Sequence, residues 1–177
     1  MLEFYNERRA KAWNAQPNAA HKAIASLESA YDVVVVTQNV DALHERAGST
    51  RVMHVHGELS YARGTGPSRK RRRIDGAPIA LGELCEEGTQ LRPDIVWFGE
   101  EAQFMVAARE HVASADTVLV VWTSLSVYPA ASLVEAVRDS ADKVLNSLDM
   151  DEVPRGFVFH AGPATVVVPR ISAEWLR

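Results

Sequence analysis

A run of apolar residues that ends abruptly at polar side chains is the strongest constraint on how this chain folds. Val33–Val36 are four consecutive valines, and after Thr37 the chain continues into the polar stretch Gln38–Asp41. An unbroken β-branched run bounded by polar groups is typical of a strand buried in a parallel sheet. Because ligands of open α/β sheets bind in the crevice at the carboxyl ends of the strands, we expect this stretch to line a ligand crevice.

A histidine follows at a comparable position on the next predicted strand. His56 comes directly after a short strand predicted at 51–55, and Gly57 behind it allows the main chain to turn sharply. A histidine in this position can act as a general base near neutral pH. In isolation it is more often a structural hydrogen-bonding residue, but the nearby polar stretch Gln38–Asp41 favours the base.

The composition is that of one globular domain without a general affinity for polyanions. The chain has 177 residues, of which 47% are hydrophobic, and this suffices for one buried core. The formal net charge of −4 provides no general attraction to nucleic acid or to anionic membranes. The basic run Arg69–Arg73 could contact phosphates, but such runs are more often solvated loops, so we expect no nucleic-acid partner.

Cysteine content and apolar spacing exclude further classes of protein. The single cysteine, Cys85, excludes an internal disulfide and any zinc site built from several cysteines. The first residues contain no apolar core of a signal peptide, and no continuous apolar stretch of about eighteen residues occurs. We therefore expect a cytoplasmic protein without a membrane span.

Strands alternate with helices along most of the chain. Helices are predicted over 2–13, after an N-cap at Asn18, over 41–46, over 101–113 and from 130 onward. Strands are predicted at 32–37, 51–55, 95–98, 117–121, 144–145, 157–159 and 166–168. This alternation predicts a parallel α/β sheet formed by 1–56 and 93–177, with 57–92 as an inserted, irregular lobe rich in glycine and proline.

Three further sets of residues allow two interpretations each. Tyr5 and Arg8 lie on one helix face and could grip a carboxylate, although a surface arginine beside a half-buried tyrosine has the same spacing. The stretch Leu91–Glu100 could pair with an extended peptide or form an ordinary core strand. Hydroxyls and amides at strand ends, as in Thr123-Ser124 and Asn146-Ser147, suit a ribose but are equally good helix caps.

Three motifs in this order, Thr37–Gly48 (TQNVDALHERAG), His54–Leu59 (HVHGEL) and Leu91–Glu100 (LRPDIVWFGE), resemble those of the sirtuins. The sirtuins are NAD-dependent protein lysine deacylases, and the chain is most similar to their bacterial desuccinylase-like type. The similarity extends over nearly the whole chain, from Phe4 to Ala164. It implies a Rossmann-like parallel sheet with flanking helices, NAD as the cofactor, and an acylated-lysine protein or peptide as the partner.

The resemblance also implies a role for each candidate residue. His56 matches the general base that acts on the ribose hydroxyls of NAD. The pocket for nicotinamide and its ribose is implied at Gln38, Asn39, Val40 and Asp41, and the surroundings of adenosine at Thr123, Ser124, Asn146 and Ala164. The acyl-lysine peptide channel is implied at Val96, Trp97, Phe98 and Gly99, and recognition of an acidic acyl group at Tyr5 and Arg8.

The implied reaction transfers the acyl group from lysine to ADP-ribose and releases nicotinamide. Three departures from the family pattern favour an alternative, a catalytically weak or inactive sirtuin-like binding module or truncated gene product. The family's Gly-Ala-Gly-Ile-Ser segment and first strand have no counterpart here, so we expect an N-terminally truncated fold with an exposed strand edge. The four zinc cysteines are reduced to Cys85, so we expect a metal-free lobe, and Trp122 replaces a glycine where its indole would obstruct NAD unless it is rotated away.

Overall fold

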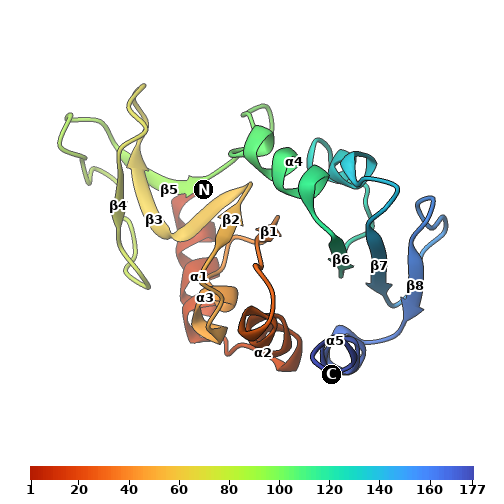
Figure 1. The fold of residues 1–177 in the computed structure, drawn as a ribbon. Coiled ribbons are helices and arrows are strands. Elements are labelled where there is room, and N and C mark those ends of the chain that lie inside the picture. Colours follow the sequence, from red (N-terminus) through yellow and green to blue (C-terminus); the bar gives the residue numbers. More distant parts are fainter.

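The parallel strands form two separate groups in the computed structural model, which describes residues 1–177 (Figure 1). In the first group, β1 (Val35–Thr37) pairs in parallel with β2 (Val52–His54). In the second, β6 (Thr117–Val121), β7 (Asp142–Ser147) and β8 (Val158–Ala161) pair in parallel in that order. The predicted parallel α/β architecture is confirmed, but the strands do not join into one sheet.

The strands β1 and β6 each have a hydrogen-bonded neighbour on one side only. In β1 the main-chain nitrogen of Val35 donates to the oxygen of Arg51, next to β2, at 2.9 Å. Since alternate residues of a parallel strand bond to the same neighbour, Val36 directs its main-chain groups away from β2. The same alternation turns Leu119 of β6 away from β7. The strand edge expected from the sequence is therefore present on both groups.

Helices connect the strands in both groups. The helices are α1 (Leu2–Asn14), α2 (Ala19–Ser26), η1 (Leu27–Ser29), α3 (Leu43–Ala47), α4 (Met105–Ser114), η2 (Ala130–Ala136) and α5 (Ala164–Trp175), where η denotes a 3-10 helix. The predicted cap of α2 is confirmed, because the side-chain oxygen of Asn18 accepts from the main-chain nitrogen of Ala20 at 2.9 Å. None of the helices combines the length and the apolar character needed to cross a membrane.

The helices pack on the parallel strands through two small cores. One core joins α2 and α5 to β6 through Ala20, Ala23, Val168, Leu119 and Val121. The other joins α4 and η2 to β1 and β2 through Ala108, Leu133, Val36, Met53 and Val55. Burial of these apolar side chains is the main favourable term that holds helices on strands. The flanking helices of the predicted Rossmann-like fold are therefore in place.

The inserted lobe is more regular than its sequence suggests. The strands β3 (Gly57–Gly64), β4 (Arg71–Arg73) and β5 (Leu91–Ile95) form an antiparallel sheet in the order β4-β3-β5. The prediction of an irregular segment over 57–92 was wrong in this respect. The strand β4 consists of three arginines, which give no apolar alternation and are held by the ion pairs described below, while Ala62, Ile79 and Leu91 form a small buried core of the lobe.

Several predicted elements have different types or bounds in the structure. The strand predicted at 32–37 covers only Val35–Thr37, and its two valines are only partly buried. The valines 166–168, predicted as a strand, lie in α5, where Val167, Val168 and Ile171 form a buried helical face. Tertiary packing overrides the strand preference of β-branched residues there. The strand predicted at 95–98 lies earlier in the chain, because β5 ends at Ile95. The helix predicted from 101 begins at Met105.

Candidate active site

The turn after β2 fixes the position of His56. Gly57 has φ +83°, and a Cβ atom there would lie 2.0 Å from the carbonyl oxygen of Asp94, so only glycine fits. The Nδ1 atom of His56 lies 3.3 Å from the main-chain oxygen of Gln38. Because a carbonyl only accepts, Nδ1 carries the proton, and Nε2 of the neutral ring is free to accept another. A general base requires this arrangement.

The main chain of the Gln38–Asp41 segment is held from two directions. The nitrogen of Asn39 donates to the hydroxyl of Thr37 at 3.1 Å, where β1 ends. The oxygen of Val40 accepts from the nitrogen of Leu59, in β3, at 2.8 Å. These bonds fix the segment between the parallel strands and the lobe.

The side chains of this segment have few partners within the chain. Asp41 accepts from the main-chain nitrogen of Leu43 at 3.0 Å, at the start of α3, through one carboxylate oxygen. The amides of Gln38 and Asn39 form no hydrogen bond inside the chain, and Asn39 is exposed. The segment whose main chain contacts His56 therefore carries two free side-chain amides and one carboxylate.

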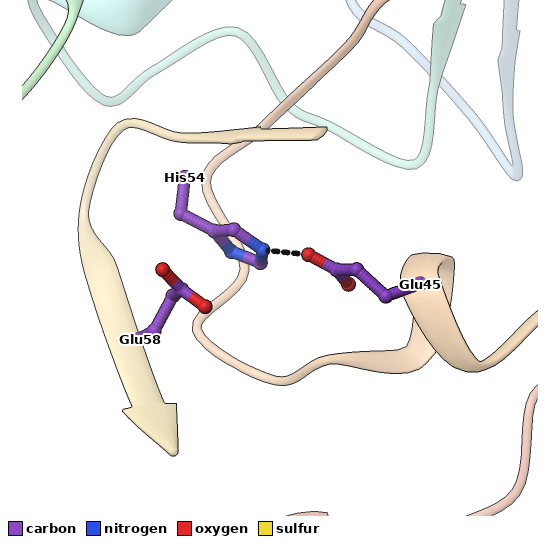
Figure 2. Close-up of side chains that lie close together, drawn as sticks. All are labelled: Glu45, His54 and Glu58. Carbon is purple, nitrogen blue, oxygen red and sulfur yellow. Dashed lines mark hydrogen bonds and ion pairs between the residues drawn. The ribbon is translucent and has the colours of Figure 1, made fainter. Parts of the chain in front are cut away.

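A second histidine, which the sequence analysis did not identify, braces the same segment. His54 is buried, with a 4% exposed side chain, and its Nδ1 lies 3.1 Å from the main-chain oxygen of Asn39. Its Nε2 lies 2.7 Å from a carboxylate oxygen of Glu45 in α3 (Figure 2). Burial alone lowers the pKa of His54, but the hydrogen bonds to Glu45 and Asn39 outweigh it, and the pKa is raised. The occurrence of His54 and His56 two residues apart, at the end of a predicted strand, is the signal that could have indicated this pair.

Glu58 completes an acidic environment around His54. Three possible ligand atoms, one each from Glu45, His54 and Glu58, lie within 4.8 Å of one another (Figure 2). A carboxylate–histidine set of this kind can ligate a divalent cation. However, the Glu45–His54 contact is a hydrogen bond at 2.7 Å, and Glu58 forms an ion pair with Arg71 at 2.6 Å. The geometry is therefore that of ion pairs within the chain rather than that of a cation site.

The two residues predicted to grip an acidic acyl group lie on α1 without contacting each other. Tyr5 stacks on Trp97, with ring centroids 6.3 Å apart. The guanidinium of Arg8 lies 5.1 Å from the ring centroid of Phe4 and forms no ion pair in the chain. Because Arg8 is exposed and its charge is unpaired, it remains available to a carboxylate ligand.

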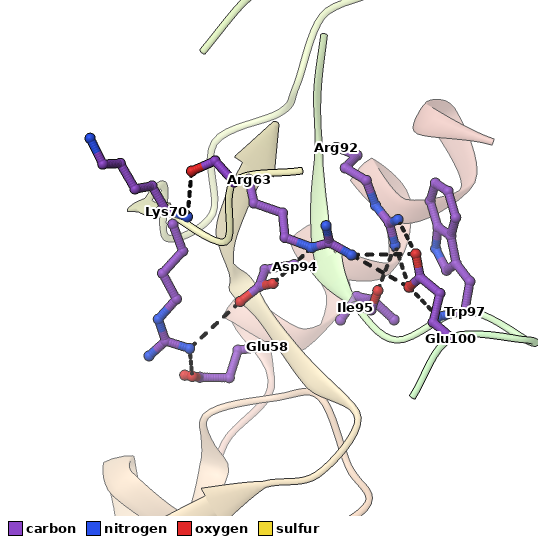
Figure 3. Close-up of polar contacts among 10 residues, drawn as sticks. Glu58, Arg63, Lys70, Arg92, Asp94, Ile95, Trp97 and Glu100 are labelled. Carbon is purple, nitrogen blue, oxygen red and sulfur yellow. Dashed lines mark hydrogen bonds and ion pairs between the residues drawn. The ribbon is translucent and has the colours of Figure 1, made fainter. Parts of the chain in front are cut away.

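Trp97 is held by a buried ionic network. The guanidinium of Arg92 lies 3.3 Å from the centroid of its ring, and Glu100 accepts from its main-chain nitrogen at 2.9 Å (Figure 3). Arg92 donates to Glu100 at 2.5 and 3.0 Å. This hydrogen bond, aided by the one from Trp97, outweighs the effect of burial and lowers the pKa of Glu100 to about 2. Arg92 thus stacks on the indole, and Glu100 holds the main chain of Trp97.

The segment that follows β5 connects this region to His56. The main-chain nitrogen of Val96 donates to the oxygen of His56 at 2.9 Å. Phe98 is fully exposed, and Gly99 adopts φ +89°. The strand ends at Ile95, so 96–99 pair with no strand, but the main chain of Val96 is bonded to His56 and that of Trp97 to Glu100.

The residues predicted around adenosine lie at the ends of β6 and β7 and at the start of α5. Thr123 accepts from the main-chain nitrogen of Leu125 at 3.1 Å, and Ser124 contacts Ser126 at 2.6 Å between hydroxyls. Ala164 is the first residue of α5. These contacts are local, as expected for turn residues.

Asn146 has a buried atom without a partner. Its side chain is fully buried, and its amide nitrogen donates to the oxygens of His160 and Gly162 at 2.8 and 3.0 Å. Its side-chain oxygen is buried and accepts no hydrogen bond. Next to it Trp122, which is 60% exposed, adopts φ +54° and donates its main-chain nitrogen to the oxygen of Asn146 at 2.9 Å.

The basic run does not present five free charges. Arg71, Arg72 and Arg73 form ion pairs with Glu58, Glu83 and Asp75 at 2.6, 2.5 and 2.6 Å. Paired arginines have less charge to offer to phosphates. The run therefore forms a charged outer strand of the lobe, as is common at the edge of a sheet.

Comparison with known proteins decides the family. Residues 2–129 match the Sir2 family. The chain belongs to the Sir2 family. It is 48% identical over 133 residues to an NAD-dependent protein deacylase of Helicobacter pylori strain J99, a match covering 75% of this chain and 56% of that relative. It is 42% identical over 184 residues to an NAD-dependent protein deacylase of Pasteurella multocida, covering 98% of this chain and 77% of the relative.

Solved structures give the same result for this Sir2 chain. A Sir2 homologue in complex with NAD superposes with a TM-score of 0.88 and 36% identity, over 98% of this chain and 70% of that one. A Sir2 protein bound to an acetylated peptide superposes with a TM-score of 0.76 and 28% identity, over 93% and 73% of the two chains. The match to the Helicobacter relative spans little more than half, 56%, of that protein's length.

Proposed function

We propose that this Sir2-family chain is an NAD-dependent protein lysine deacylase that removes acetyl or succinyl groups from lysine side chains. The observation that carries the proposal is the arrangement at His56, whose Nδ1 donates to Gln38 and whose Nε2 is free. The free amides of Gln38 and Asn39 follow on the same main chain. Relatives named as NAD-dependent protein deacylases support this assignment.

The residues present fit the nicotinamide and ribose half of NAD. Unpaired amides of Gln38 and Asn39 can donate to a carboxamide or hydroxyl, and Val40 and Asp41 complete the segment. When bound, NAD supplies the ribose carbon that receives the acyl oxygen and the nicotinamide that departs. His56 would take a proton from a ribose hydroxyl at its Nε2 atom. Around adenosine we assign Thr123, Ser124, Ala164 and Asn146, whose buried oxygen lacks a partner.

The substrate in this proposal is an acylated-lysine protein or peptide. We assign its channel to Val96, Trp97, Phe98 and Gly99, because Val96 is bonded directly to His56, Phe98 is exposed, and the segment lies outside the strands. Tyr5 and Arg8 would contact an acidic acyl group, with Tyr5 already stacked on Trp97. We divide the chain into a cofactor-binding core, 1–56 and 93–177, and the lobe 57–92, for which we propose no zinc.

Nicotinamide release tests the proposal. The purified chain is incubated with NAD and either an acetyl-lysine or a succinyl-lysine peptide, and nicotinamide is measured by chromatography. We expect release that His56→Ala abolishes and that His111→Ala, in α4, leaves unchanged. Release no greater than that of His56→Ala would reject the proposal and favour a sirtuin-like binding module, for which the exposed Trp122 is the structural argument.

A further inference from the structure

His54, at the end of β2, and His56, in the turn that follows, contact consecutive carbonyl groups of the cofactor-binding segment. Nδ1 of His54 lies 3.1 Å from the oxygen of Asn39, and Nδ1 of His56 lies 3.3 Å from the oxygen of Gln38. Successive peptide groups are therefore held from the same strand end. The side-chain amides of Gln38 and Asn39 are left free for a ligand.

The contacts of His54 determine its protonation. Both of its ring nitrogens face acceptors, the main-chain oxygen of Asn39 and the carboxylate of Glu45. A neutral imidazole can donate through only one nitrogen, so two acceptors require the imidazolium. Unlike His56, this ring therefore carries a charge and has no nitrogen left for proton transfer.

The charges around His54 come from three elements. From α3, Glu45 favours the imidazolium while His44 opposes it, and from β3 Glu58 favours it. Arg71 of β4 is paired with Glu58 and partly offsets its charge. The two carboxylates favour the imidazolium more than His44 and Arg71 oppose it, and Glu45 is in direct contact with the ring.

We propose that His54 is a positioning residue, a buried imidazolium that clamps the main chain of the Gln38–Asp41 segment to α3 so that its amides and His56 face one ligand. A charge-assisted hydrogen bond is stronger than one between neutral groups, so the clamp resists displacement. The inference rests on the proposed function for its catalytic consequence. The protonation state of His54 does not depend on that function.

The first test is nuclear magnetic resonance of the ligand-free 177-residue protein. Nitrogen–proton correlations of the imidazole rings are recorded at about pH 8, well above the ordinary histidine pKa of about 6.5. His54→Ala assigns the signals of His54, and His111 serves as the reference. We expect protons on both ring nitrogens of His54. A neutral His54 with one protonated nitrogen at this pH would overturn the proposal, whether or not the protein releases nicotinamide.

The second test uses Glu45→Gln, which removes the charge at a partly exposed site and keeps the side-chain shape. Without the carboxylate, His54 loses its proton at lower pH. We expect kcat/KM for NAD to fall about tenfold near pH 8, where only the wild type keeps the imidazolium, and to change less than about twofold near pH 5, where both proteins keep it, as for the loss of one charge-assisted hydrogen bond. Glu174→Gln, an exposed substitution on α5, is the control and should match the wild type at both pH values.

A loss that is equal at both pH values would indicate a general structural defect and overturn the positioning role. Unchanged kinetics at pH 8 would overturn it as well. If the wild-type chain releases no nicotinamide, the proposed function fails, and the resonance experiment alone decides the charge of His54.

Discussion

Trp122 adopts a backbone conformation that suits glycine. Its φ of +54° lies in the left-handed region, and its side chain is 60% exposed. A bulky residue held there stores about 1–3 kcal/mol of strain, while the exposed indole returns little by packing. We expect Trp122→Gly to raise the free energy of unfolding by about 1 kcal/mol, measured by urea denaturation.

The matched control for Trp122→Gly is Trp122→Ala, which removes the indole but keeps a Cβ atom. If the backbone is strained, the alanine variant should be less stable than the glycine variant. Equal stabilities would show that φ at this position carries no cost. The two variants also separate the indole from the backbone in calorimetric titration with NAD, because both should bind more tightly if the indole obstructs the cofactor.

Arg8 is the free cation nearest to Tyr5 on α1. Since Arg8 forms no ion pair, we expect Arg8→Met to lower kcat/KM for a succinyl-lysine peptide by about tenfold, as for one lost charge-assisted hydrogen bond, with little effect on acetyl-lysine. The measurement is nicotinamide release with the two peptides side by side. Equal losses on both would remove the acidic-acyl assignment.

The His54–Glu45 pair makes stability depend on pH in two directions. The pKa of His54 is raised above 6.5, so its contribution is complete below about pH 6.5 and is lost as pH rises through the folded value. The pKa of Glu45 is lowered by the hydrogen bond to His54, despite burial, so its contribution is present above about pH 4.5 and is lost as pH falls through the folded value. We expect the stability difference between wild type and Glu45→Gln to be largest between these limits and to shrink on both sides in urea titrations. A difference independent of pH would contradict the ion pair.

At the scale of the elements, a network of charges adds to the small apolar core of the lobe. A chain of contacts runs from Glu58 through Arg71, Asp94 and Arg63 to Glu100 (Figure 3). The side chains of Arg63 and Asp94 are 8% and 5% exposed, so the pairing is mostly desolvated. Such a network is costly to interrupt, because a buried charge is left without a partner.

Glu100→Gln interrupts the network where two arginines meet. Arg63 and Arg92 would both lose a carboxylate, and we expect the free energy of unfolding to fall by about 2 kcal/mol. Glu83→Gln, which breaks the exposed pair with Arg72, is the control and should leave the denaturation midpoint nearly unchanged. Since Glu100 also anchors Trp97, Glu100→Gln alone should raise KM for the acyl peptide. A similar effect of both substitutions on stability would contradict a cooperative network.

The correctly predicted elements are those marked by a run of apolar residues or by a helix cap. The strand Thr117–Val121 and the Asn18 cap of α2 were predicted from valine runs and capping chemistry. The lobe strands could not be predicted, because ion pairs between residues up to 37 positions apart replace apolar alternation. The valines 166–168 were assigned to a strand because propensity does not report the buried face of α5.

The candidate site was predictable only in part for a related reason. Gln38–Asp41 and His56 follow strand ends, a position visible in the sequence. The partners of His54 are a main-chain oxygen and a helix carboxylate, and no local pattern encodes that contact. The absence of an Arg8–Tyr5 contact likewise depends on the rotamer of Arg8, which turns toward Phe4.

At the scale of the whole molecule, the two parallel groups leave β1 and β6 with open edges (Figure 1). All five residues of β6 are only partly buried, although four of them are apolar. An unpaired apolar edge is a template for pairing with another chain. We therefore expect the 177-residue chain to associate in a concentration-dependent way, measurable by sedimentation velocity.

Proline substitution locates the edge that associates. Asp116 and Trp122 bond to β7 through their main chains, so by alternation Val118 also bonds to β7 and Leu119 directs its main-chain nitrogen away from it. Proline removes the N–H group, so Leu119→Pro should weaken association while the fold persists, and Val118→Pro should lower the thermal unfolding midpoint. Leu119→Ala truncates the same side chain but keeps the N–H group, and it should associate like the wild type. If Leu119→Ala and Leu119→Pro associate equally, the contact does not use the main chain of β6, and the edge of β1 or a side-chain surface is the interface instead.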